Sequence, residues 1–152
     1  MVMAKMLQAL IVQDPIAIGL PLPRYGHEDD TCLDIAVAED VMIPSFGGID
    51  VRTGIRIVPP PGYYFRVVGK GSSARRGLSF NLEVIDCGYR GEIILHPWNS
   101  SPHEVKVERG QCIAQLELVK ITPVELKLVD ISKLDETPRG EGRMDSTKTG
   151  IV

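Results

Sequence analysis

Aromatic residues, cysteines and long apolar runs are all scarce in this chain. Aromatic residues make up 5% of its 152 residues, and it has three cysteines. An odd number of cysteines without a Cys-x-x-Cys pair argues against a disulfide framework or a zinc cage, and it predicts a reducing compartment, the cytoplasm. No apolar run reaches the roughly 20 residues that a membrane span requires. The first residues also lack the basic start and small-residue cleavage site of a secretory signal.

The charge is nearly balanced, with a formal net charge of -3. Such a mild balance predicts no general attraction to nucleic acid or to an acidic membrane. Hydrophobic residues make up 43% of the sequence. A chain of this length can bury roughly 68–70% of its unfolded surface, which is enough for one domain with its own core.

Short runs of alternating apolar and polar residues recur between Gly- and Pro-rich turn signals such as 59–62. Such alternation is typical of half-buried strands. The predicted strands are residues 49–53, 63–68, 105–107, 112–119 and 124–129. Many close strands without a long helical period predict an all-β sandwich, jelly roll or barrel. One short helix is expected from Ser72 or Ser73 to Gly77, because Ser caps helices and Gly ends them.

The strand pattern fails after about Ile131, and residues 135–150 are polar, charged and rich in Gly. This composition is typical of a mobile tail. The sequence therefore predicts a β domain over residues 1–131 and a flexible C-terminal arm over residues 132–152.

Residues 84–93 carry the most distinctive chemistry and read Val-Ile-Asp-Cys-Gly-Tyr-Arg-Gly-Glu-Ile. Asp86 ends an apolar strand, and Tyr89 follows a Gly turn, so a hairpin would carry one acid and one aromatic ring at its mouth. A rigidly held carboxylate can take a proton from an attacking water. Taken alone, the pair is also typical of an Asp that caps its own turn and a Tyr that covers the core edge.

This run resembles the central motif of the trimeric dUTPase family, whose members hydrolyse dUTP to dUMP and pyrophosphate. The resemblance makes Asp86 the base that activates water and places the Tyr89 ring against the deoxyribose, where it would exclude a ribose hydroxyl. Family members read uracil largely through the backbone of the span 80–85, which makes Asn81, Val84 and Ile85 candidate contacts. They usually carry Gly where this chain has Glu83, which would either obstruct the base or point to solvent.

Two segments before this hairpin resemble the family's phosphate and metal motifs. Lys70, Gly71 and Ser72 fall where an Arg-Ser-Ser run opens a short helix against the triphosphate, so Lys and Gly replace the usual Arg and first Ser. Asp34, between Leu33 and Ile35, matches the Asp that reaches Mg²⁺ through water. An unpaired carboxylate among apolar residues is costly, so its partner would be hydrated Mg²⁺ or a basic side chain from another subunit.

Two later segments complete the resemblance. Gln115 lies in a run close to the fourth motif and would face the phosphates or Ser72, although an ordinary polar residue on a core strand fits equally. In the tail, Arg139, Ser146 and Thr147 match residues that bind the γ-phosphate at a neighbouring subunit's site. Met144 stands in place of the Phe that stacks on uracil, and it can cover a base without the contribution of a ring.

The resemblance thus implies an all-β jelly-roll or distorted-barrel homotrimer with a mobile C-terminal arm, dUTP as substrate and Mg²⁺ as cofactor. One alternative is a dCTP deaminase of the same fold, which would need a Glu where this chain has His96. Another is a catalytically impaired trimer that binds nucleotide or protein, suggested by the changes at Lys70, Gly71, Glu83 and Met144. The sequence predicts that the histidines, His96 included, are surface or edge residues without metal-ligand spacing.

Overall fold

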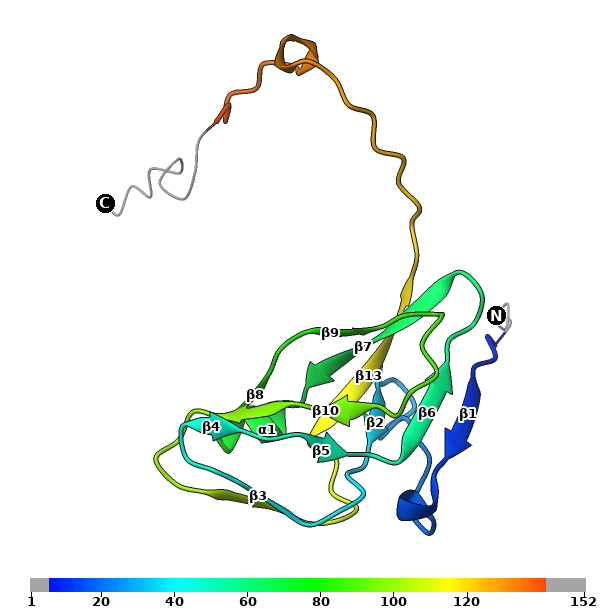
Figure 1. Cartoon of the computed structure of the whole chain (residues 1–152), viewed down its shortest axis with the longest axis vertical. Helices are drawn as coiled ribbons and strands as arrows, with labels where there is room; N and C mark the ends of the chain where they lie inside the picture. The colour runs from blue at the N-terminus through cyan, green and yellow to red at the C-terminus, as the bar shows by residue number, and fades with distance from the viewer. Residues whose placement is uncertain (1–5, 142–152) are drawn as a thin grey trace. The chain divides into compact units, whose positions relative to one another are not determined.

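The computed structural model describes residues 6–141. Internal contacts divide the chain into two units, one ending at Ile121 and one beginning at Thr122. The first unit is built almost wholly of short strands around one small helix (Figure 1). The all-β prediction is therefore confirmed. Within residues 6–141, no helix is long and apolar enough to cross a membrane.

The first unit contains all the described strands, an α-helix and a 3-10 turn. The strands are β1 (Leu10–Gln13), β2 (Leu33–Ile35), β3 (Val41–Ile43), β4 (Gly47–Gly48), β5 (Val51–Arg52), β6 (Ile55–Val58), β7 (Tyr63–Gly69), β8 (Leu78–Phe80), β9 (Glu83–Ile85), β10 (Ile94–Leu95), β11 (Pro97–Asn99), β12 (Val105–Val107) and β13 (Ala114–Lys120). The helix is α1 (Gly71–Arg75), and the 3-10 turn is η1 (Pro15–Ala17).

The largest sheet has four strands in the order β2-β13-β7-β9, and every pairing in it is antiparallel. Alternation decides which side chains enter the core: Phe65 and Val67 of β7 and Leu116 of β13 are buried, while their neighbours are more exposed. The predicted strands at 63–68, 105–107 and 112–119 are confirmed to within two residues at their ends. The strand expected at 49–53 is shorter and comprises β5 alone.

The remaining strands pair antiparallel as β1-β6, β10-β5, β12-β3 and β4-β11-β8. Together with the large sheet they enclose one apolar core. Its fully buried side chains include Ile35, Ile43, Val51, Leu95 and Leu116. This core fixes the strand ends and hairpins that carry the candidate functional residues.

The short helix differs from the prediction at its beginning. It begins at Gly71, and the residue before it is Lys70, whose side chain makes no capping bond. The Ser73 hydroxyl is buried and instead donates to the Ile113 carbonyl at 2.7 Å, which ties the helix to the core. Gly77 follows the helix with φ +82°, as expected for a residue that ends it.

The second unit contains no strand in its described residues, 122–141. The alternation at 124–129 predicts a strand, but the side chains are exposed, and Leu128 is 100% exposed. Alternation marks a strand with two different faces, but a strand also needs a partner for its backbone groups. The structured piece of this unit is the 3-10 turn η2 (Ile131–Lys133), which the Asp130 carboxylate caps by accepting from Ser132 N at 3.0 Å.

Candidate active site

Four of the predicted site residues line one cleft beside strand β9. Val84, Ile85, Asp86 and Tyr89 border a cavity of about 370 Å³. The turn after β9 is closed by a hydrogen bond from Tyr89 N to the Asp86 carbonyl at 3.0 Å. The Asp86 carboxylate is exposed, and within residues 6–141 it has no hydrogen-bond partner.

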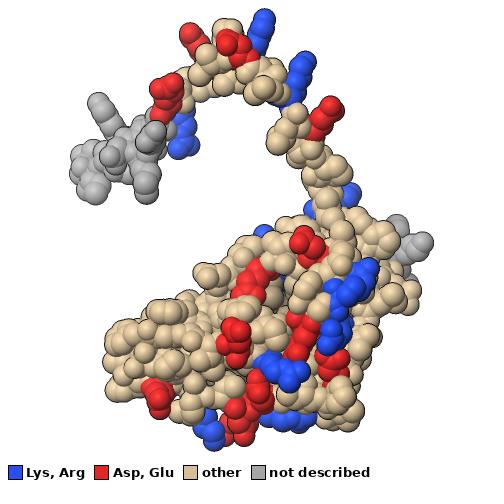
Figure 2. Space-filling model, in the orientation of Figure 1, with Lys and Arg blue, Asp and Glu red and all other residues tan. Residues whose placement is uncertain are grey.

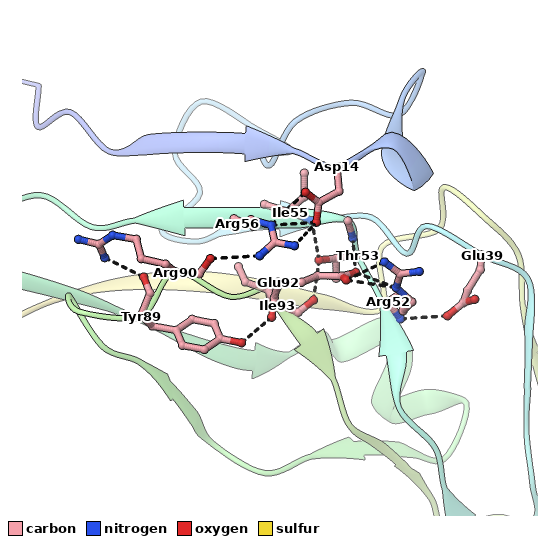
Figure 3. A network of polar contacts seen from close by, with 11 residues as sticks. Asp14, Glu39, Arg52, Thr53, Ile55, Arg56, Tyr89, Arg90, Glu92 and Ile93 are labelled. Atoms are coloured by element: carbon pink, nitrogen blue, oxygen red, sulfur yellow. Dashed lines mark hydrogen bonds and ion pairs between the residues drawn. The ribbon is translucent and has the colours of Figure 1, made fainter.

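The Tyr89 ring is held by its own hairpin (Figure 3). Its hydroxyl donates to the Glu92 carbonyl at 2.9 Å. The ring crosses over Gly91, where an added Cβ would overlap the Tyr89 hydroxyl and ring. The Arg90 guanidinium donates to the carbonyls of Cys87 and Tyr89, each at 2.8 Å. The position of the ring is therefore set by the hydrogen bond of the Tyr89 hydroxyl and by the two hydrogen bonds of Arg90 to the turn.

The hairpin is anchored through the Glu92 carboxylate to strand β5 and to the turn that follows it (Figure 3). Glu92 Oε1 accepts from Gly54 N at 2.8 Å, and Oε2 pairs with Arg52 Nη2 at 2.9 Å. On β6, Arg56 donates to the Arg90 carbonyl at 3.3 Å and pairs with Asp14 at 2.9 Å. The hydrogen bond from Arg56 lowers the pKa of Asp14, so this carboxyl stays ionised.

The cleft beside β9 also contains an ionisable cluster that sequence reasoning missed. His96, predicted as a surface or edge residue, lines the cleft and places Nδ1 2.8 Å from Glu83 Oε1. Its Nε2 lies 3.4 Å from Asp50 Oδ1. The Glu83 carboxylate is therefore in contact with His96, and its side chain is only partly exposed to solvent. Leu95 and Pro97, on either side of His96, are buried, and this alternation was the available signal.

A second cleft, of about 340 Å³, contains Asp34, Lys70 and Gln115. Gln115 lies opposite Asp34 in the register of β13 and β2. The Gln115 amide donates to the Gly69 carbonyl at 3.3 Å, which directs it toward the end of β7 where Lys70 follows. Three residues predicted from separate motifs thus meet in one place.

The partner of Asp34 is a basic side chain of the same chain. Lys70 Nζ lies 2.5 Å from Asp34 Oδ1, and both side chains are about three-quarters buried. The sequence indicates hydrated Mg²⁺ or a basic side chain from another subunit, and it does not indicate this partner within the chain. The strand pairings explain the difference, because β13 joins β2 to β7 and so brings the start of α1 beside Asp34.

The other predicted residues line neither of these two clefts. Gly71 and Ser72 are exposed on the first turn of α1, next to Lys70. Asn81 borders an adjoining hollow of about 300 Å³ with the half-exposed Trp98 and with Asp50 and His96, which also line the cleft beside β9. Arg139 belongs to the second unit. Three further predicted residues fall outside the described residues: Met144, Ser146 and Thr147.

The two clefts lie at opposite edges of the four-stranded sheet. Asp34 belongs to edge strand β2, and Asp86 directly follows the other edge strand, β9. Three inter-strand spacings separate these edges, roughly 14 Å. On the face shown in Figure 2, acidic and basic side chains are interspersed, and neither sign forms a broad patch. One chain therefore has two different clefts. One contains the exposed carboxylate of Asp86 and the ring of Tyr89, and the other contains Lys70 paired with Asp34.

Comparison with known proteins identifies the family of the chain. A family model described as dUTPase matches residues 19–148. The deoxyuridine 5'-triphosphate nucleotidohydrolase of Thermobifida fusca (strain YX) is 40% identical over 132 residues, which cover 84% of this chain and 73% of that protein. The protein of the same name from Paramecium bursaria Chlorella virus 1 is 36% identical over 126 residues, covering 82% of this chain and 88% of that protein.

Solved structures agree on the fold. A mutant dUTPase of Staphylococcus bacteriophage 80alpha with dUpNHpp matches with a TM-score of 0.80 at 21% identity, covering 91% of this chain and 97% of that one. A mutant dUTPase from phage phi11 of S. aureus, described with a structural Mg(II) ion, matches with a TM-score of 0.71 at 19% identity over 81% of this chain and 97% of that one. The fold is thus the all-β jelly roll of these dUTPase structures. The chain belongs to the dUTPase family.

Proposed function

We propose that this chain hydrolyses dUTP to dUMP and pyrophosphate. The observation that carries the proposal is the cleft beside β9, where an exposed carboxylate, Asp86, and a fixed aromatic ring, Tyr89, lie on one hairpin. The choice of dUTP as the substrate of that cleft is supported by membership of the dUTPase family and by the shared name of the relatives. These relatives do not favour deamination as the alternative. The chain also has His96 at the position where a deaminase would need a Glu.

The Asp86 carboxylate is the general base. It takes a proton from water as the water oxygen bonds to the α-phosphorus, and the bond from that phosphorus to the bridging oxygen of the pyrophosphate breaks. An exposed carboxylate with no partner among residues 6–141 is free to hold this water. Tyr89 packs flat against the deoxyribose and leaves no room for a 2′-hydroxyl. Val84, Ile85 and Asn81 provide the base contacts.

The cleft at Asp34 receives the phosphates. Lys70 and Gln115 provide a cation and an amide, and Gly71 and Ser72 add the first turn of α1 beside them. Asp34 fits a magnesium ion through water, because Mg²⁺ usually keeps several waters and takes one or two carboxylates plus substrate phosphates. Only its Oδ1 is engaged among the described contacts. When bound, Mg²⁺ offsets the charge of the triphosphate.

A complete site requires more than one copy of the chain, and we assign a homotrimer. The base cleft and the phosphate cleft face opposite edges of one sheet, so a second copy is needed to bring the two kinds of cleft together. Two segments have exposed apolar side chains, the alternating run at 124–129 and strand β1. Such side chains are expected on strands that pack against another copy of the chain. The arm at 132–152, with Arg139, Met144, Ser146 and Thr147, closes the site of a neighbouring subunit.

The cytoplasm remains the predicted location. It rests on the state of Cys32, Cys87 and Cys112, none of which forms a disulfide.

The experiment that tests the function measures pyrophosphate and ammonia released from dUTP, dCTP, dTTP and UTP, with Mg²⁺ and with a chelator. Light scattering on the same sample gives the oligomer mass. Pyrophosphate from dUTP but not from UTP, in a trimer and only with Mg²⁺, is the expected result. Ammonia from dCTP would indicate a deaminase. A folded trimer that releases neither product would be a binding protein.

A further inference from the structure

A row of polar side chains crosses the sheet at Asp34 and continues past the cleft described above. Arg24 and Asp34 face each other as an antiparallel bridge, in which Arg24 N donates to the Asp34 carbonyl at 3.2 Å and Asp34 N donates back at 2.7 Å. On the other side of β2, Gln115 lies opposite Asp34. Side chains of directly opposed residues lie on the same face of a sheet. Arg24, Asp34 and Gln115 therefore share one face, across two strand spacings of roughly 10 Å in total.

Arg24 lines a further hollow, of about 390 Å³, beside the cleft at Asp34. The hollow and the cleft share Gly26 and Asp34, so they adjoin. The thiol of Cys112, which also lines the hollow, senses the charges around it. Burial raises the pKa of Cys112, and the Asp34 carboxylate raises it further. Lys70 and Arg24 both lower that pKa, so the two cations lie close enough to act on one thiol.

The hollow at Arg24 carries a positive charge that is not balanced locally. Within residues 6–141, the Arg24 guanidinium has no ion-pair or hydrogen-bond partner. Among the described residues that line the hollow, Asp34 is the one carboxylate, and it is already paired with Lys70. The cleft at Asp34, in contrast, is also lined by the exposed carboxylate of Asp30. An anion bound at Lys70 therefore extends more favourably toward Arg24 than toward Asp30.

We infer that Arg24 is a second phosphate-binding cation of this site, and that the phosphate chain of a nucleoside triphosphate spans the cleft at Lys70 and the hollow at Arg24. The inference takes its ligand from the proposed function and adds a residue that binds it. A guanidinium is always charged, and its planar fork of donors matches phosphate oxygens. The row is wider than one phosphate group, so a ligand with a single phosphate leaves one of the two positions empty. Arg24 binds the ligand and takes no part in bond breaking.

The test measures binding of inorganic triphosphate and of dUMP by calorimetry, with Mg²⁺, on the full-length protein. Arg24→Gln should weaken inorganic triphosphate about tenfold, the low end of the range for a hydrogen bond to a charged group, because Arg24 is exposed. Binding of dUMP should stay within twofold. Arg24→Lys should restore part of the affinity, since it keeps the charge without the fork. Arg75→Gln is the matched control, because it removes the same charge from an exposed position of α1 that lines neither the cleft nor the hollow.

Kinetics with dUTP provide a second readout. Arg24→Gln should raise KM by a similar factor and leave kcat within threefold, because the substitution leaves Asp86 and its water in place. The inference is overturned if the wild type does not bind inorganic triphosphate, or if Arg24→Gln weakens it no more than Arg75→Gln does. An equal loss of dUMP and triphosphate would also overturn it, since Arg24 would then serve no separate phosphate position. If triphosphate affinity depends on Arg24 but dUTP releases no pyrophosphate, the phosphate site stands and the proposed hydrolysis fails.

Discussion

Replacing Asp86 with Asn separates chemistry from folding and from binding. The side chain is exposed and has no hydrogen-bond partner among residues 6–141, and the turn bond uses the Asp86 carbonyl, which Asn keeps. The free energy of unfolding should therefore change by less than about 0.5 kcal/mol. A positioned general base contributes typically 10²- to 10⁴-fold. Its loss should lower kcat by that factor, which corresponds to about 2.7–5.5 kcal/mol in the activation free energy.

The assay follows pyrophosphate release from dUTP, with dUTP affinity measured separately by calorimetry. The Kd should stay unchanged or fall slightly, because the variant removes a negative charge that faces the anionic triphosphate. Asp29→Asn is the matched control, since Asp29 is also exposed and lies in neither cleft. A kcat within threefold of the wild type would refute the assignment of Asp86 as the base. A tenfold weaker Kd with normal kcat would make it a binding residue instead.

Three other predictions concern the ring, the arm and a stabilising ion pair. Gly91→Ala should displace the Tyr89 ring and raise KM for dUTP several-fold, whereas Gly88→Ala, where an added Cβ meets nothing within 4 Å, should leave KM unchanged. The same KM in both variants would refute a role of the ring position in binding. Deleting residues 135–152 should lower kcat/KM without lowering the Tm of the β unit; unchanged kinetics would make the arm idle. Asp14 has a lowered pKa through its guanidinium partner, so its stabilisation is present above the unfolded pKa of about 3.9 and is lost as pH falls through the lower folded pKa. Urea midpoints should thus decline less steeply below about pH 4 in Asp14→Asn.

Local signals predicted strands β7, β12 and β13, each of which finds its partner within the chain. The alternating runs that became β7 and β13 pair along seven residues each, so their pattern and their environment agree. The run at 124–129 has the same alternation but no partner among residues 6–141, and it is exposed. Hydrophobic pattern reports which face a strand would bury, whereas pairing depends on a second strand that the pattern does not specify.

The same distinction applies to the candidate site: contacts between residues close in sequence could be predicted, and contacts between distant residues could not. The acid and ring of the hairpin could be read from a short run, because Asp86 and Tyr89 are joined by their own turn. The contacts from Lys70 to Asp34 and from His96 to Glu83 could not, since they join residues 36 and 13 positions apart. Such pairs arise from strand register, which a motif in one segment does not encode.

The ion pair between Lys70 and Asp34 would couple the binding of the two ligands proposed for this cleft, the phosphates and Mg²⁺. Lys70 Nζ lies 2.5 Å from Asp34 Oδ1, so each charge is already neutralised by the other. An anion that draws Lys70 away leaves Asp34 in need of a cation, and a cation at Asp34 releases Lys70 toward an anion. Under the proposed function, each ligand would therefore increase the affinity for the other, and thermodynamic reciprocity would require the two increases to be equal. The triphosphate and its counter-ion would enter as one cooperative unit, and a free nucleotide without metal would bind against an internal competitor.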